Sequence, residues 1–135
     1  MISQPNSVMA ALTLNLLRMV TGWLFLAHGL QKVFGLLGRE NPAELLTLTG
    51  AAGVLELVGG TMIVLGLFTR PTAFILSGQM AFAYFLRHFP SDPIWPILNR
   101  GELAALYCFL FLFLAFNGGG EFSLDGWMRR RSLKR

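Results

Sequence analysis

Residues 45–68 read LLTLTGAAGVLELVGGTMIVLGLF, and Glu56 is the one charged residue among them. A helix needs about 20 predominantly apolar residues to cross the hydrocarbon core of a bilayer. This stretch reaches that length, so it predicts a membrane-spanning helix that carries one acidic side chain near its middle.

Three further apolar stretches accompany it, at about residues 12–34, 72–89 and 103–116. The first is long enough to span a bilayer, and the other two need their flanking residues to do so. We therefore expect an all-α fold: an integral membrane four-helix bundle in up-down order, forming a single transmembrane domain over residues 1–135. The helices are expected at about residues 12–34, 42–68, 71–89 and 100–117.

The composition supports this class of protein. Of the 135 residues, 54% are hydrophobic and 13% are charged, and the mean hydropathy is +0.58. A soluble domain of this size could not bury so much apolar surface, because small domains leave a large fraction of their area in water. The composition thus argues against a soluble enzyme, a disordered segment and a nucleic-acid binder.

Caps and prolines indicate the helix boundaries. Residues 41–44 (NPAE) supply a cap, a first-turn proline and an acidic residue, so we expect the second helix to begin there. Three prolines predict that residues 90–98 are not helical. Residues 99–102 (NRGE) resemble the cap of the fourth helix, and the glycines at 118–120 predict its end.

Basic residues predict the orientation. An even number of spans places both termini on one side of the membrane, together with Arg70 and the basic tail at residues 127–135. Four basic residues are expected on the other side. Because the tail is concentrated next to a helix end, the positive-inside rule predicts that both termini are cytoplasmic.

Glu56 is the sharpest functional candidate, because a charge near the bilayer centre costs about 3 kcal/mol on insertion scales. The residues three and four positions away are all small, which predicts that Glu56 faces a close helix contact built on Gly53, Gly59 and Gly60. Glu56 is then either a proton-carrying or ligand-binding carboxylate, or a polar packing group bonded to another helix. Gln79, at mid-depth in the third span, is a plausible partner.

A second polar cluster is expected on the outer side, where alternating helices bring the ends of the first and third spans to the start of the fourth. Its members are His28, Gln31, Lys32, Arg87, His88, Asn99 and Glu102.

Several interpretations of this cluster remain open. It could be a quinone headgroup site, a bis-histidine haem site or a metal site. Haem and metal are less favoured, because no further nitrogen or thiolate ligand is near. Alternatively, Lys32, Arg87 and His88 are interfacial anchors, and Glu102 completes a capping box on Asn99.

Arg18 lies a turn or two inside the first span. We expect its side chain to extend to cytoplasmic headgroups, and pairing with a buried acid is the alternative.

Three motifs in a fixed order resemble the DoxX family. Residues 18–32 (RMVTGWLFLAHGLQK) resemble its first helix, and residues 56–60 (ELVGG) with 65–71 (LGLFTRP) resemble its second helix and the following turn. Residues 99–103 (NRGEL) and 118–125 (GGGEFSLD) resemble its third signature. The positions that match the motifs are Arg18, Gly29, Lys32, Glu56, Gly60, Arg70, Asn99, Glu102 and Asp125.

The resemblance implies a multi-pass, four-helix protein of the bacterial inner (plasma) membrane. The family is named for its relation to a subunit of an archaeal terminal oxidase and thiosulfate:quinone oxidoreductase system, and some members are associated with membrane redox complexes. The family carries no agreed catalytic residues, so the resemblance transfers no catalytic role to this chain.

Three functions remain open from the sequence. The first is an accessory or quinone-contacting subunit of a membrane oxidoreductase system, with the bilayer and redox-complex subunits as partners. The second is a small-molecule transporter built as a homo-oligomer. The third is a membrane assembly factor or scaffold that binds partner helices.

Overall fold

The computed structural model describes residues 6–134, and every regular element in that range is helical. The elements are α1 (Asn6–Phe34), α2 (Leu48–Leu65), α3 (Thr69–Ala83), the π-helical turn η1 (Tyr84–His88), α4 (Pro96–Asn99), α5 (Glu102–Asn117) and α6 (Leu124–Ser132). The expectation of an all-α protein is confirmed for this part of the chain.

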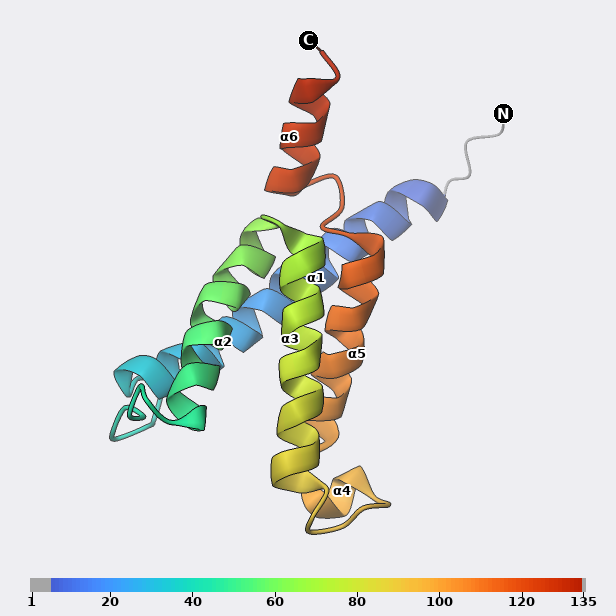
Figure 1. Cartoon of the computed structure of the whole chain (residues 1–135). Helices are drawn as coiled ribbons and strands as arrows, with labels where there is room; N and C mark the ends of the chain where they lie inside the picture. Colours follow the sequence, from blue (N-terminus) through green and yellow to red (C-terminus); the bar gives the residue numbers. More distant parts are fainter. Residues whose placement is uncertain (1–5, 135) are drawn as a thin grey trace.

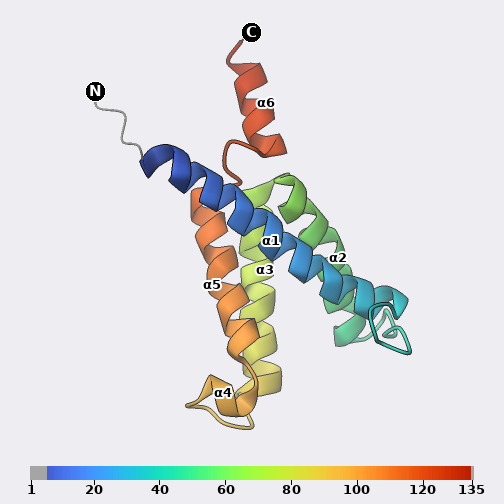
Figure 2. The same cartoon turned by 180° about the vertical axis from the view of Figure 1, so that it is seen from behind.

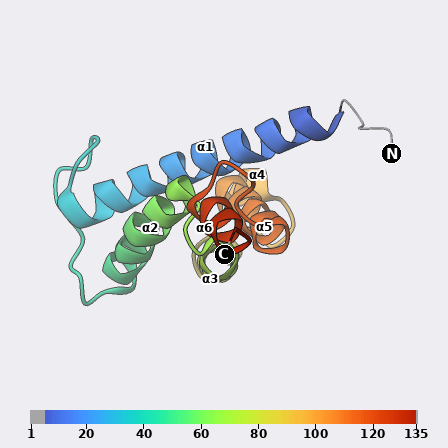
Figure 3. The ribbon, with the colours of Figure 1, turned by 90° about the horizontal axis from the view of Figure 1, so that it is seen from above.

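The helices α1, α2, α3 and α5 alternate in direction along the chain (Figure 1). α1 packs mainly against α2, and α3 packs mainly against α5, while fewer contacts join these two pairs. Seen from behind, α1 crosses the other helices obliquely (Figure 2). Seen from above, it lies along one side of them (Figure 3). The start of α1 and the whole of α6 lie at one end, and α4 lies at the other (Figure 1).

The distribution of side chains is the reverse of that in a soluble protein. Among the buried side chains of the described residues, nine are polar or charged and eight are apolar or aromatic. Large apolar side chains lie instead on the outside of the helices, such as Trp23 on α1, Phe74 on α3 and Phe109 on α5, each more than 60% exposed. This pattern suits a surface that contacts lipid.

Two helices are long and apolar enough to cross a membrane by length and composition, namely residues 7–34 of α1 and all of α2. α5 is apolar but shorter. These two helices support an association with membranes.

Glycines bring α1 and α2 into backbone contact. A Cβ atom added to Gly22 would lie 2.7 Å from the backbone nitrogen of Val64, and one added to Gly60 would lie 2.7 Å from that of Leu26. A Cβ atom on Gly29 would collide with the backbone of Leu57. Small residues at such positions permit close helix approach, which is typical of helix pairs in membranes.

The second helix begins later than expected. Residues 41–44 do not cap it, because the chain there turns back toward α1 and the Ala43 amide donates to the Lys32 carbonyl at 2.7 Å. The cap is Thr47, whose hydroxyl accepts from the Gly50 amide at 3.1 Å. α2 ends at Leu65, where Gly66 adopts the left-handed conformation (φ 65°) typical of a helix C-cap.

Two short helices were not expected from the sequence. The prediction that residues 90–98 are not helical is wrong at its end, because Pro96 occupies the first turn of α4, where its missing N–H is no loss. Most of the basic tail belongs to α6, which is capped by Ser123 and carries arginines in its last turn, where they complement the helix dipole.

Candidate functional site

A cavity of about 570 Å³ lies between the α1–α2 pair and the α3–α5 pair. Its apolar walls come from residues such as Phe25, Met80 and Leu103. Its polar lining residues are His28, Lys32, Thr49, Glu56, Gln79, Arg87, His88, Arg100 and Tyr107. The volume falls in the range of small-molecule sites, which are mostly apolar with a few convergent polar groups.

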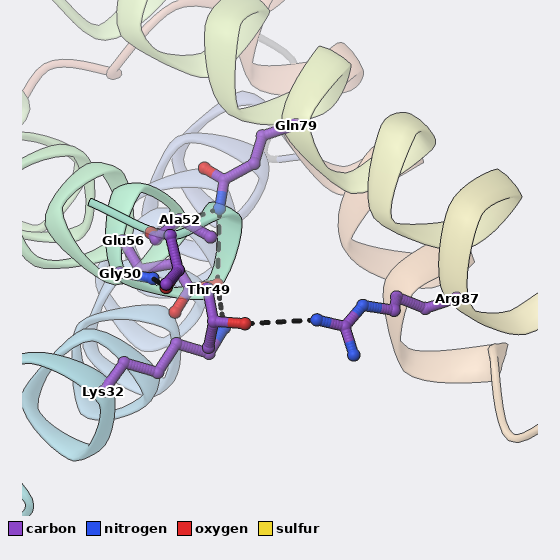
Figure 4. A network of polar contacts seen from close by, with 8 residues as sticks. Lys32, Thr49, Gly50, Ala52, Glu56, Gln79 and Arg87 are labelled. Carbon is purple, nitrogen blue, oxygen red and sulfur yellow. Dashed lines mark hydrogen bonds and ion pairs between the residues drawn. The ribbon is translucent and has the colours of Figure 1, made fainter. Parts of the chain in front are cut away.

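Glu56 lies at the centre of the polar network (Figure 4). Its side chain is 3% exposed, and its Oε1 accepts from Lys32 Nζ at 2.6 Å. The Gln79 amide also donates to Oε1, at 3.3 Å, and to the Ala52 carbonyl at 3.3 Å. The contact expected between Glu56 and Gln79 is therefore present, and the ion pair with Lys32 was not foreseen.

The small residues around Glu56 have distinct neighbours. A Cβ atom on Gly53 would lie 2.7 Å from Lys32 Cβ, so Gly53 makes room for the lysine of the ion pair. Gly59 faces Leu76 of α3, and Gly60 faces the backbone of α1. The helix face that carries Glu56 thus packs against both neighbouring helices.

Two acceptor atoms in this network have no donor. Glu56 Oε2 and Gln79 Oε1 are buried and have no hydrogen-bond partner among the residues that the structure describes. A buried polar atom without a partner costs about 1–3 kcal/mol. Such atoms next to a cavity mark a place where a bound molecule can supply the missing donor.

Two arginines line the cavity from the second helix pair. The Arg87 guanidinium on η1 donates to Thr49 Oγ1 on α2 at 3.1 Å and so bridges the two pairs (Figure 4). Arg100 has a positive φ of 57°, which is uncommon for a residue with a side chain. Arg100 is the C-cap of α4, a position where the left-handed conformation is common.

A buried amide holds the turn that carries Arg100. Asn99 donates to the Asp92 carbonyl at 2.7 Å and to Tyr84 Oη at 3.2 Å, and it accepts from the Gly101 amide. His88 Nδ1 donates to the Asn99 carbonyl at 2.9 Å. Asn99 is thus a structural support of the loop rather than a lining residue of the cavity.

The same loop contains a carboxylate in a tight turn. The Asp92 side chain accepts from the backbone amides of Trp95, at 2.8 Å, and Ile94, at 2.9 Å. These two hydrogen bonds favour the ionised form and lower the pKa of Asp92 from its usual value.

Both histidines line the cavity, His28 from α1 and His88 from η1. The His28 ring meets Tyr107 edge to face, with the centroids 6.4 Å apart. No group of three or more His, Cys, Asp and Glu side chains within residues 6–134 is arranged to hold a metal ion.

Besides Asn99, two more residues of the predicted outer cluster do not line the cavity. Glu102 lies in a separate apolar hollow beside Trp95 and Leu106. It forms no capping box with Asn99, because the N-cap of α5 is Gly101 and no side chain caps that end. Gln31 donates instead to the Leu37 carbonyl in the loop after α1, at 2.8 Å.

The expectation that Arg18 extends to headgroups is wrong. Arg18 is 1% exposed. Its guanidinium donates to the carbonyls of Gly119 and Phe122 at 2.8 Å, of Ile63 at 2.7 Å, and of Val64. We call Arg18 and these four carbonyl groups the Arg18 clasp. The last carbonyls of a helix lack the full set of intrahelical donors, so a guanidinium at the end of α2 meets acceptors there, and the Ile63 carbonyl accepts from the Gly66 amide as well.

Asp125 reinforces the clasp from the C-terminal segment. Its carboxylate accepts from the backbone amides of Phe68 and Thr69 at 2.8 Å each, at the start of α3. Its own amide donates to the Gly66 carbonyl at 2.9 Å. The clasp and Asp125 thus fasten the segment before α6 to the α2–α3 turn.

Thr49, Arg100 and Tyr107 line the cavity but were missed in the sequence. Leu103 and Ala104 precede Tyr107 by four and three residues on α5, and all three line the cavity, whereas Arg100 lies before this helix. That helical spacing was the available signal for Tyr107, but it points to the cavity only once the packing of α5 is known.

Comparison with known proteins identifies the family of this chain. The family model described as DoxX matches residues 13–89, which span α2, α3 and η1 and most of α1. A protein of Haemophilus influenzae (strain ATCC 51907 / DSM 11121 / KW20 / Rd), described as uncharacterized, is 43% identical over 119 residues. That match covers 81% of this chain and 85% of the relative. No solved structure matches.

Proposed function

This chain belongs to the DoxX family, and we propose that it is a multi-pass inner-membrane protein that holds a quinone headgroup in its central cavity. In this role it is an accessory subunit of a membrane oxidoreductase system, and it positions the ring rather than carrying out the chemistry alone.

The proposal that four helices span the membrane is supported by their outer surfaces. Apolar side chains more than half exposed occur on all four long helices, among them Val58 on α2, Ile75 on α3 and Phe116 on α5. The helix α3 is short, but η1 follows it without a break, so we treat the two together as one membrane span. Arg18 and Glu56, the charged residues that lie away from the helix ends, are both buried, as a lipid solvent requires.

Both termini are proposed to be cytoplasmic. The arginines in the last turn of α6 stand at the same end of the molecule as the start of α1 (Figure 1). Basic residues next to a membrane-spanning segment favour the cytoplasmic side. A cysteine introduced after Ser132 should therefore react with a membrane-impermeant maleimide only after the cells are opened. Labelling of intact spheroplasts would reverse the orientation.

One observation carries the quinone proposal: the cavity combines apolar walls with hydrogen-bonding groups supplied by both helix pairs. A quinone has a flat apolar ring with two carbonyl acceptors. The guanidinium of Arg87 and the hydroxyl of Tyr107 are donors that suit such acceptors. A lipophilic ring can reach such a site from the bilayer.

Binding of a short-chain benzoquinone to the protein in lipid nanodiscs tests the proposal. Ala83→Phe fills the cavity, because Ala83 is one of its lining residues. Gly78→Phe is the matched control, because Gly78 lies on the same helix and a Cβ atom there meets nothing within 4 Å. We expect Ala83→Phe to weaken binding at least about tenfold and Gly78→Phe to bind like the unmodified protein.

Equal binding by the two variants would place the quinone outside the cavity, and no saturable binding at all would overturn the proposal. Native mass spectrometry from the host membrane then separates the remaining functions. Co-purified quinone or redox subunits support the proposed role. A bare homo-oligomer favours transport, and a bare monomer favours a scaffold.

A further inference from the structure

Two buried oxygen atoms without donors in the described part of the chain belong to Glu56 and Gln79, which line the cavity at what we call its inner end. These atoms are Glu56 Oε2 and Gln79 Oε1. Most buried polar atoms in proteins are satisfied, so two unsatisfied acceptors on adjoining side chains call for an explanation.

The assignment of these atoms as acceptors is fixed by their neighbours. The Gln79 amide nitrogen faces the Ala52 carbonyl and Glu56 Oε1, which both accept, so the opposite orientation of the amide would place oxygen against oxygen. The Lys32 ammonium is directed at Glu56 Oε1, at 2.6 Å. The free positions are therefore Oε2 of the carboxylate and Oε1 of the amide.

We propose that the inner end of the cavity recognises a donated hydroxyl, so that the ligand of this site is the hydroxyl-bearing, reduced form of the ring: a quinol. This inference rests on the proposed function and adds to it the redox form that the site prefers. A quinone carries only carbonyl acceptors and can satisfy neither free oxygen. A quinol hydroxyl donates its proton in a hydrogen bond to Glu56 Oε2 or Gln79 Oε1.

The charges of the cavity favour a neutral donor over a cationic one. Lys32 and Glu56 compensate each other as an ion pair. The remaining permanently charged lining residues are Arg87 and Arg100, which are both positive. An ammonium ligand would be repelled by them, whereas a neutral hydroxyl is not.

The two oxygens are buried, so a side-chain rotation has to bring either of them to the cavity. The terminal torsions of glutamate and glutamine side chains are broad rather than confined to narrow wells. A modest rotation of either group turns its free oxygen toward a ligand in the cavity.

The experiment compares three probes on the unmodified protein in nanodiscs under anaerobic conditions: a short-chain benzoquinol, the matching benzoquinone and the di-O-methyl ether of the quinol. Binding is measured by equilibrium dialysis. A hydrogen bond to a charged group is worth enough that the quinol should bind about tenfold more tightly than either probe that lacks hydroxyl groups.

Variants locate the effect. Glu56→Gln places an amide N–H₂ where an acceptor is needed, so the ratio of quinone to quinol dissociation constants should fall toward one. Gln79→Met should lower the same ratio by a smaller factor. Ser77→Ala is the matched control: Ser77 is also a buried polar residue of α3, but it bonds to the Cys108 carbonyl, at 2.8 Å, and does not line the cavity. Its ratio should stay as in the unmodified protein.

The outcomes separate this inference from the proposed function. If quinone and quinol bind equally well in the cavity, the preference for the hydroxyl form is overturned while the quinone site stands. If neither probe binds, both proposals fall. Since the comparison of probes uses the unmodified protein, a variant that fails to fold leaves the decision intact.

Discussion

Two buried charges in the α1–α2 pair have opposite surroundings. Arg18 makes four hydrogen bonds to backbone carbonyls and does not line the central cavity. Glu56 lines the cavity and keeps one oxygen without a donor from residues 6–134. A charge in the apolar interior is a functional candidate by default. Within that range, only Glu56 of these two has an atom without a hydrogen-bond partner that a ligand could bind.

The comparison shows that both charges are buried, and that they differ in how completely their polar atoms are hydrogen-bonded. A fully hydrogen-bonded charge is structural, and one with a free polar atom can bind a ligand. Every partner of Arg18 is a backbone carbonyl near a helix end or in the segment before α6, so the guanidinium completes a fold. The partners of Glu56 are side chains of two other helices, which can rearrange around a ligand.

The largest expected effect belongs to Arg18→Met. The Ile63 carbonyl keeps the Gly66 amide as a donor, so the substitution leaves the other three carbonyl groups without one. Each such loss costs about 1–3 kcal/mol, so we expect at least about 3 kcal/mol of destabilisation. Thermal unfolding in mild detergent measures it. Arg18→Lys should recover only part of the loss, because an ammonium cannot serve four carbonyls in a fork. If Arg18→Met is as stable as the unmodified protein, Arg18 is not the structural charge that the comparison requires.

Gly29→Ala tests the contact that both regions share. Gly29 lies between Arg18 and Lys32 on α1, and a methyl group there would collide with the backbone around Leu57. Overpacking of this kind typically costs about 1–3 kcal/mol, so the melting temperature should fall clearly but less than in Arg18→Met. An unchanged melting temperature would show that α1 and α2 can separate without loss.

Lys32→Met leaves the Glu56 carboxylate without its cation. Removing one partner of a fully buried pair costs about 3–5 kcal/mol, and because Lys32 is 25% exposed, we expect about 2 kcal/mol. The double variant Lys32→Met with Glu56→Met should regain most of this stability, since apolar replacement of a buried pair is often neutral. If the double variant is less stable than Lys32→Met, the pair itself stabilises the fold, as Arg18 does.

Gly78→Ala should have the smallest effect and the opposite sign. A Cβ atom at this position meets nothing within 4 Å, and α3 is helical there. Replacing glycine by alanine inside a helix stabilises by about 0.5–1 kcal/mol. The contrast with Gly29→Ala separates a glycine required for close packing from one that is not, and a clear destabilisation would indicate an unseen partner on that face.

The sequence predicted the helices well where length and hydropathy decide. The membrane-type character follows from length and hydropathy, and the small-residue face around Glu56 follows from spacing along one helix. The contact with Gln79 was expected because both residues lie at mid-depth of their helices. The Arg18 clasp could not be predicted, because its acceptors are backbone carbonyls 45 to 104 residues away. The Lys32–Glu56 pair likewise depends on the register between α1 and α2, which the glycine contacts set and the hydropathy pattern does not.

Only some of the residues that line the cavity were predicted from the sequence. His28, Lys32, Arg87 and His88 were grouped because helix ends meet at one side of an alternating bundle. Glu102 and Asn99 were placed with them by the same argument, but the loop before α5 turns Asn99 inward and leaves Glu102 in another hollow. Topology predicts which end of a helix a residue occupies, and only packing decides which face it presents.

The wide turn η1 has a consequence for the number of residues in this part of the chain. The Phe89 amide bonds to the Tyr84 carbonyl at 3.0 Å, five residues back, where an α-helix would reach four. Such a turn holds one more residue than an α-turn and shifts the phase of everything that follows by about 100°. A single deletion between Tyr84 and His88 would restore a regular helix but rotate its end and the following loop away from the cavity. The number of residues between Tyr84 and His88 therefore sets the direction in which the following loop leaves the helix.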